Sequence, residues 1–104
     1  MARQRLFEVA LLPPALRDAD EIHAHIAESN PLNADRFVIE LKASIRSLAR
    51  FPKRCRVARE SRIAGFEVRA AIFGQYRVLF TIIGNSVAVM RIVHGAQKHG
   101  GSRS

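Results

Sequence analysis

The sequence is poor in cysteine, aromatic residues and acidic residues. It has one cysteine, Cys55, one tyrosine and no tryptophan, and no apolar run approaches the roughly 20 residues of a membrane-spanning helix. A lone cysteine excludes an internal disulfide bond and is typical of a protein kept in a reducing compartment. Near the N-terminus, Glu8 interrupts the apolar stretch too early for a signal peptide. We therefore expect a cytoplasmic protein that does not bind membranes.

Motifs for metals and cofactors are also missing from the sequence. There is no cysteine pair and no His-Glu-x-x-His pattern. His23 and His25 are two positions apart on a predicted helix, where their side chains diverge. Gly74 and Gly84 fall between predicted strands, so tight turns explain them and no glycine-rich phosphate loop remains. The sequence therefore predicts neither a metal site nor a cofactor.

What the sequence does have is positive charge, and the excess lies in its second half. The 104 residues include 17 Lys and Arg against 9 Asp and Glu, which gives a net charge of +8. Residues 1–51 carry seven basic and seven acidic side chains, whereas residues 52–104 carry ten basic side chains and only Glu60 and Glu67 as acids. Such a field favours an anionic partner, either a nucleic acid or an acidic protein segment, although solubility alone is the plainer explanation.

The first half predicts a strand followed by two helices. Residues 5–11 form a short run with Phe and Val that stops at Pro13-Pro14, as a strand would. From Ala15 onward, apolar side chains recur at steps of three and four, which indicates a helix ending at Ser29-Asn30-Pro31. A second helix is predicted from about Leu32 to Arg50. Two helices joined by so short a turn should pack antiparallel, as a hairpin.

The second half predicts a basic loop and three strands. Residues 53–59 are basic and have no clear period, so we expect a loop or an irregular extended segment there. The runs 66–72, 76–83 and 86–93 are rich in β-branched and other apolar residues and end at turn residues, which is typical of strands.

Together these elements predict an α+β fold in the order β-α-α-β-β-β. An N-terminal strand and an α-helical hairpin would pack on a mostly antiparallel four-stranded sheet. We expect residues 1–95 to form a single domain and residues 96–104, rich in Gly and Ser, to form a flexible basic C-terminal tail. The predicted core between hairpin and sheet contains Leu41, Ile45, Leu48, Val78, Phe80, Ile82, Val89 and Ile92.

Three arginines on the predicted strands form the most informative polar cluster. Arg69, Arg77 and Arg91 lie on successive strands, and Lys98 follows them in the tail. Because side chains alternate along a strand, one face of the sheet could present several guanidinium groups while the other packs on the helices. Guanidinium pairs bidentately with phosphate or carboxylate, so we predict that these four residues bind an anionic partner. Salt bridges to carboxylates of the chain itself are the alternative, and we favour this alternative for Arg91.

The motifs and their order resemble the RelE/ParE toxin superfamily. The resemblance covers residues 9–95 and is greatest to the ParE-like branch, whose members are often labelled plasmid stabilisation proteins. It rests on Leu12-Pro13-Pro14-Ala15 with Asp18 and Ile22, Asn30-Pro31 with Ala34 and Arg36-Phe37, Leu48 with Phe51-Pro52, YRVLFTI at 76–82 and VAVMRIVHG at 87–95. This resemblance implies the toxin of a type II toxin–antitoxin system, with a cognate acidic antitoxin as its partner.

The resemblance leaves two activities open. RelE-like members cleave messenger RNA in the ribosome; here Arg69 and Arg77 would hold phosphate and His94 would move a proton. ParE-like members are not known as nucleases and block DNA gyrase by binding. This chain has Glu67 where RelE-like members favour lysine, and no tyrosine follows His94. We therefore prefer gyrase inhibition without catalysis, with the ribosome-dependent nuclease as the alternative and a non-toxic binding module on the same fold as a third interpretation.

Overall fold

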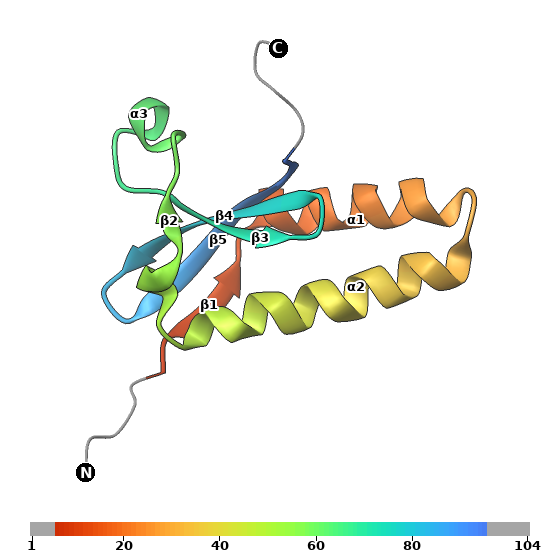
Figure 1. Ribbon diagram of the computed structural model, residues 1–104, viewed down its shortest axis with the longest axis horizontal. Coiled ribbons are helices and arrows are strands. Elements are labelled where there is room, and N and C mark those ends of the chain that lie inside the picture. Colours follow the sequence, from red (N-terminus) through yellow and green to blue (C-terminus); the bar gives the residue numbers. More distant parts are fainter. Residues whose placement is uncertain (1–5, 96–104) are drawn as a thin grey trace.

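A computed structural model describes residues 6–95 of the chain. Its elements in chain order are β1 (Glu8–Leu11), α1 (Pro13–Ala27), α2 (Pro31–Arg46), the 3-10 turns η1 (Ser47–Ala49) and η2 (Pro52–Arg54), β2 (Arg56–Val57), α3 (Ser61–Ala64), β3 (Arg69–Phe73), β4 (Tyr76–Ile83) and β5 (Ser86–His94). The predicted α+β fold is confirmed: α1 and α2 run side by side as a hairpin against the sheet (Figure 1). The predicted tail, residues 96–104, lies outside the described residues.

The helical hairpin forms where the apolar periodicity predicts it. Pro13 and Pro14 occupy the first turn of α1, where a backbone N–H would have no partner in the helix. Asn30 caps α2, since its side-chain oxygen accepts a hydrogen bond from the backbone N–H of Asn33 at 3.1 Å. α2 ends at Arg46 and continues as the 3-10 turn η1, so it is shorter than predicted. No helix within residues 6–95 is long and apolar enough to cross a membrane.

The sheet has five strands in the order β1-β5-β4-β3-β2, one more than the four predicted. β1 pairs with β5 in parallel, and the other neighbours pair antiparallel. The additional strand is β2, in which Arg56 pairs with Ala70 and Val57 with Arg69. It lies in the basic segment for which we predicted a loop or an irregular extended conformation. Two residues are too few to show a periodicity, so the sequence pattern did not reveal this strand.

The main core lies between the hairpin and one face of the sheet, which we call the helix face. Val78 and Phe80 are buried on this face. The predicted core residues are all buried there, except that Ile82 is only partly buried. The opposite face, which we call the outer face, carries Leu79. There Leu79 packs in a smaller cluster with Ala58 and Val68.

Beyond the end of β1, Asp18 on α1 provides the hydrogen-bond acceptor that β5 would otherwise lack on this side. β1 pairs with β5 only as far as Val89. Past that point the Asp18 carboxylate accepts a hydrogen bond from the backbone N–H of Ile92 at 2.9 Å and bidentate hydrogen bonds from Arg91 at 2.7 and 3.0 Å. The Asp18 side chain is only 11% exposed, and a carboxylate this buried is tolerated because it is paired. These bonds fix α1 against the sheet.

Replacing Asp18 by alanine should therefore destabilise the fold. The Asp18→Ala change leaves the Ile92 N–H without its acceptor, and we expect the free energy of unfolding to fall by about 1–3 kcal/mol. The matched control is Asp20→Ala, which removes the same charge from an exposed position on the same helix. Urea denaturation followed by circular dichroism measures both. Equal effects of the two changes would contradict the role given to Asp18.

Candidate functional site

The arginines predicted to form one row do not share a face of the sheet. The register of the β3–β4 hairpin places Arg69 opposite Phe80 and Arg77 opposite Ile72. Phe80 is buried on the helix face, so Arg69 also lies on that face. Arg77 is three positions from Phe80 on the same strand, so it lies on the outer face. The expectation that one face presents both guanidinium groups is therefore wrong.

Arg69 is used inside the fold. Its guanidinium donates hydrogen bonds to the carbonyl oxygens of Lys53 at 3.0 Å and Cys55 at 2.6 Å, and its Nε lies 3.3 Å from a carboxylate oxygen of Glu67. The Arg69 side chain is 15% exposed. These bonds tie the segment between η2 and β2 to the sheet, which is a structural use of this residue.

Arg77 pairs with Glu60 through two hydrogen bonds. The two guanidinium nitrogens lie 2.7 and 3.0 Å from the two carboxylate oxygens. This bond lowers the pKa of Glu60 and raises the pKa of Arg77, in each case against the opposing effect of partial burial. Because Glu60 immediately precedes α3, the pair fastens the α3 segment to β4.

The other predicted binding residues are placed differently. Arg91 is half exposed at the edge of β5, and its hydrogen bonds to Asp18 raise its pKa, so the favoured interpretation of an internal salt bridge is confirmed. Lys98 lies outside the described residues. Arg91 keeps exposed surface, but its charge is already matched by an internal carboxylate.

The residues of the alternative nuclease site are also dispersed. His94 pairs with Tyr76, and the two rings pack edge to face with centroids 5.2 Å apart. The His94 Nε2 atom lies 3.1 Å from the side-chain oxygen of Gln75. His94 lies opposite Tyr76 on β4, and Arg69 lies opposite Phe80 on the same strand. Because Tyr76 and Phe80 are four positions apart, His94 and Arg69 are separated by about 13 Å along the strand direction. Arg77 lies on the other face, so the three residues do not converge.

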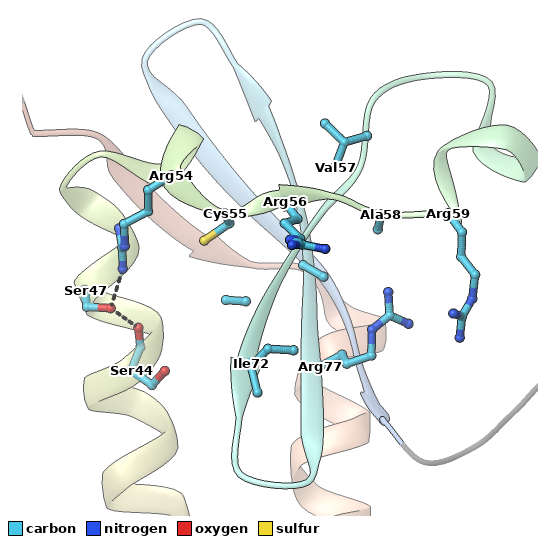
Figure 2. A pocket seen from close by; sticks show the side chains of 12 residues that line it. Ser44, Ser47, Arg54, Cys55, Arg56, Val57, Ala58, Arg59, Ile72 and Arg77 are labelled. Atoms are coloured by element: carbon cyan, nitrogen blue, oxygen red, sulfur yellow. Dashed lines mark hydrogen bonds between the residues drawn. The ribbon is translucent and has the colours of Figure 1, made fainter.

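A basic groove beside β2 and β3 is the most distinctive site among the described residues. It encloses about 710 Å³ and contains four arginines, with no acidic residue in its lining. Figure 2 shows Arg59 and Arg77 extending toward it, with Ser44 and Ser47 on α2 and η1 at its other end. We call it the arginine groove; its lining residues are Ser44, Ser47, Arg54, Cys55, Arg56, Val57, Ala58, Arg59, Ala70, Ala71, Ile72 and Arg77.

Sequence reasoning identified only Arg77 of the four groove arginines. The signal for the others was the basic run of residues 53–59, which we noted but did not treat as a site. Within that run, Arg54 supports the chain: its guanidinium donates to the carbonyl oxygens of Arg50 at 2.5 Å and Phe51 at 3.0 Å. Phe51 has a φ of 47°, a left-handed conformation that is costly for a side chain of this size. Arg54 therefore stabilises a strained turn at one end of the groove.

Neither the cysteine of the groove nor the acidic residues suggest catalysis or metal binding. Burial raises the pKa of the Cys55 thiol, despite the opposing charges of Arg54 and Arg69, so the reactive thiolate is disfavoured. In the part of the chain that the structure describes, no three His, Cys, Asp or Glu side chains come together as metal ligands. The groove instead offers guanidinium and hydroxyl donors, which suit binding of an anion.

The Arg77–Glu60 pair should make stability depend on acid pH. The folded state lowers the pKa of Glu60 below its ordinary value of 4.5, so the pair contributes fully above pH 4.5 and its contribution is lost as the pH falls below that value. We expect Glu60→Gln to destabilise the protein by about 1 kcal/mol at pH 7. The difference between the two proteins in urea denaturation should shrink toward pH 3. A difference independent of pH would contradict this use of Glu60.

Comparisons with known proteins agree with the fold. The chain matches, over residues 9–99, the family described as the ParE toxin of the type II toxin–antitoxin system parDE. Among solved structures it is similar to a chain of the chromosomal ParDE TA system from P. aeruginosa, with a TM-score of 0.71 at 20% identity over 86% of this chain and 96% of that one. No curated protein matches it. The family match spans most of the sequence, and the chain belongs to the ParE toxin family of type II toxin–antitoxin systems.

Proposed function

We propose that this protein stops cell growth by binding and inhibiting DNA gyrase, and that a cognate acidic antitoxin neutralises it. Membership of the ParE family supports the toxin role. Gyrase is the target implied by the resemblance to the ParE-like branch. Because gyrase acts in the cytoplasm, we expect the protein there. The free thiol of Cys55, which is partly buried, is consistent with this reducing compartment.

The observation that favours inhibition by binding over RNA cleavage is that Arg69, Arg77 and His94 do not come together in the structure. Cleavage needs phosphate-binding and proton-transferring groups around one scissile bond. Arg69 is bonded to backbone carbonyls on the helix face, Arg77 is paired with Glu60 on the outer face, and His94 packs against Tyr76. A toxin that acts by occupying a surface of its target requires no such convergence.

The charge distribution supports an acidic antitoxin. The second half of the chain carries the whole net charge of +8, and its acids, Glu60 and Glu67, are paired with arginines inside the fold. An acidic segment that folds on binding would be attracted to this half and would neutralise it.

Expression tests the toxin role and its target together. Induction of this chain alone should arrest growth, and coexpression with the neighbouring small open reading frame should restore it and yield a complex that copurifies. The purified toxin should inhibit gyrase supercoiling in vitro and leave translated messenger RNA intact. Normal growth on induction would support the non-toxic binding module instead, and cleaved transcripts would support the nuclease.

The His94→Ala variant separates gyrase binding from the nuclease alternative in cells. If the protein acts by binding, His94→Ala should arrest growth nearly as strongly as the unmodified chain, because the residue is not required for chemistry. A nuclease that uses His94 as an acid or base would lose roughly 100-fold or more in cleavage rate. Circular dichroism of the purified variant shows whether its fold is intact. A fully folded variant that no longer arrests growth would contradict the proposal.

A further inference from the structure

Residues 59–67 form a compact loop around α3, which we call the α3 loop. Its two ends are joined, because the backbone N–H of Ala58 donates a hydrogen bond to the carbonyl oxygen of Val68 at 2.7 Å. In Figure 1, α3 projects beyond β2 and β3, on the side away from both helices of the hairpin. Compact surface loops whose ends lie close together frequently carry function.

Hydrogen bonds fix the base of the α3 loop. The Ser61 hydroxyl accepts a hydrogen bond from the backbone N–H of Val68 at 2.8 Å and donates one to the carbonyl oxygen of the same residue at 3.1 Å. Glu60 is held by Arg77. After α3, Gly65 adopts a φ of 81° and its N–H donates to the carbonyl oxygen of Ser61 at 3.0 Å, which closes the short helix. The loop is therefore ordered before a partner binds, and this lowers the entropy that binding costs.

The tip of the α3 loop presents apolar side chains to solvent. Ile63 is 91% exposed, which makes it the most exposed large apolar side chain among the described residues. Phe66, three positions further along the loop, is exposed as well. A single exposed apolar side chain is common on protein surfaces, but here two of them lie on one projecting, ordered element. This arrangement is typical of a surface that a partner covers.

An apolar hollow lies at the base of the same loop. It encloses about 330 Å³ and is lined by Phe66 and Glu67 of the loop and by Thr81, Ile82 and Ile83 of β4. Ile83 is exposed, so the hollow is open to solvent on an apolar side. A hollow of this volume has room for one large side chain of a partner. The loop thus combines a projecting apolar side chain with a hollow that can receive one.

The charges of the α3 loop favour a partner with acidic groups beside its apolar site. Both acids of the loop are already paired with arginines of the strands. Arg62, which directly precedes Ile63, is exposed. A protein that receives Ile63 in a pocket therefore gains electrostatic complementarity from a carboxylate at the rim of that pocket.

The shape of the α3 loop favours a folded protein as its partner. A segment that folds on binding lies along grooves and sheet edges, whereas an ordered projection fits a concave site on a folded protein. A nucleic-acid backbone would place phosphates beside Ile63 and leave its apolar surface uncovered. A second copy of this chain would bring the arginines of two loops together, and like charges would oppose that contact.

We propose that the α3 loop is the surface by which this toxin docks on its protein target. Ile63 enters an apolar pocket of the target, and Arg62 pairs with a carboxylate at the rim of that pocket. The hollow beside Phe66 receives an apolar side chain of the target in return. The inference rests on the proposed function for the identity of the target, which is gyrase.

Inhibition of purified gyrase by the full-length protein tests the docking surface. Ile63→Ser should raise the concentration that halves supercoiling activity by about tenfold or more, because the projecting side chain is lost. The matched control is Ile39→Ser, which changes an isoleucine that is 67% exposed on α2 and should shift this concentration less than about twofold. Circular dichroism melting shows whether each variant is folded. Equal effects of the two changes would overturn the proposal.

The charge contact has its own matched pair of variants. Arg62→Gln should weaken inhibition about threefold, whereas Arg36→Gln, which removes the same charge from an exposed position on α2, should leave it within about twofold. An equal loss in both variants would mean that only the overall charge matters, and it would overturn the contact assigned to Arg62.

Photo-cross-linking locates the contact directly. A benzophenone amino acid in place of Ala64, which is exposed beside Ile63, should cross-link to a gyrase subunit on irradiation. The same group in place of Ala43, which is exposed on α2, should not. Cross-linking from Ala43 but not from Ala64 would place the contact on the helical hairpin and overturn the proposal.

Antitoxin binding and growth separate this inference from the proposed function. Ile63→Ser should still copurify with the antitoxin; a variant that loses the antitoxin yet inhibits gyrase fully would overturn the assignment of the loop to the target. If the unmodified toxin inhibits gyrase and Ile63→Ser does so equally, the proposed function stands and the docking surface is wrong. If the unmodified toxin arrests growth without inhibiting gyrase, the proposed target is wrong. Loss of that arrest in Ile63→Ser, but not in Ile39→Ser, would still support docking through the loop.

Discussion

The two-residue turn at Gly74–Gln75 sets the register of β3 against β4, and this register decides the face on which each polar side chain lies. The turn pairs Phe73 with Tyr76, and Gly74 supplies the positive φ of 58° that so tight a connection needs. Shifting the register by one residue would move Arg77 into the core and Phe80 into solvent. The burial of Phe80 therefore specifies the position of Arg77, and the polar arrangement of the outer face is a consequence of core packing.

The elements that carry a long hydrophobic pattern could be predicted from the sequence. The two helices, β4 and β5 each span enough residues for a period of 3.6 or 2 to show, and the core residues follow from these periods. β2 and α3 could not be predicted, because two and four residues show no period. Their positions depend on tertiary contacts: Arg69 holds the carbonyl of Cys55, and the Ser61 hydroxyl bridges both backbone groups of Val68.

The candidate site was only partly predictable for a related reason. That Arg77 and Arg91 matter could be inferred from their positions on strands, but their partners come from distant parts of the chain. Asp18 precedes Arg91 by 73 positions and Glu60 precedes Arg77 by 17. Ion pairs of this kind depend on the packing of α1 against the sheet and on the path of the chain before α3, which no local pattern encodes. The basic run beside β2 was visible in the sequence, but its proximity to Arg77 and to an open sheet edge was not.

Internal pairing changes how the positive charge of this protein can act. At long range the positive charge of a paired arginine is cancelled by the negative charge of its carboxylate. The Glu60–Arg77 and Asp18–Arg91 pairs therefore add little to the electrostatic field that guides a partner. The net charge of +8 must then be expressed by basic residues outside these pairs, and the exposed Arg56 at the sheet edge is one of them. The pairs act locally instead, because each joins parts of the chain that are distant in sequence: Asp18 fixes α1 against β5, and Glu60 fastens the segment before α3 to β4. The basic side chains therefore fall into two groups: the arginines in these ion pairs hold the fold together, and the basic residues outside the pairs supply most of the field that would attract an anionic partner.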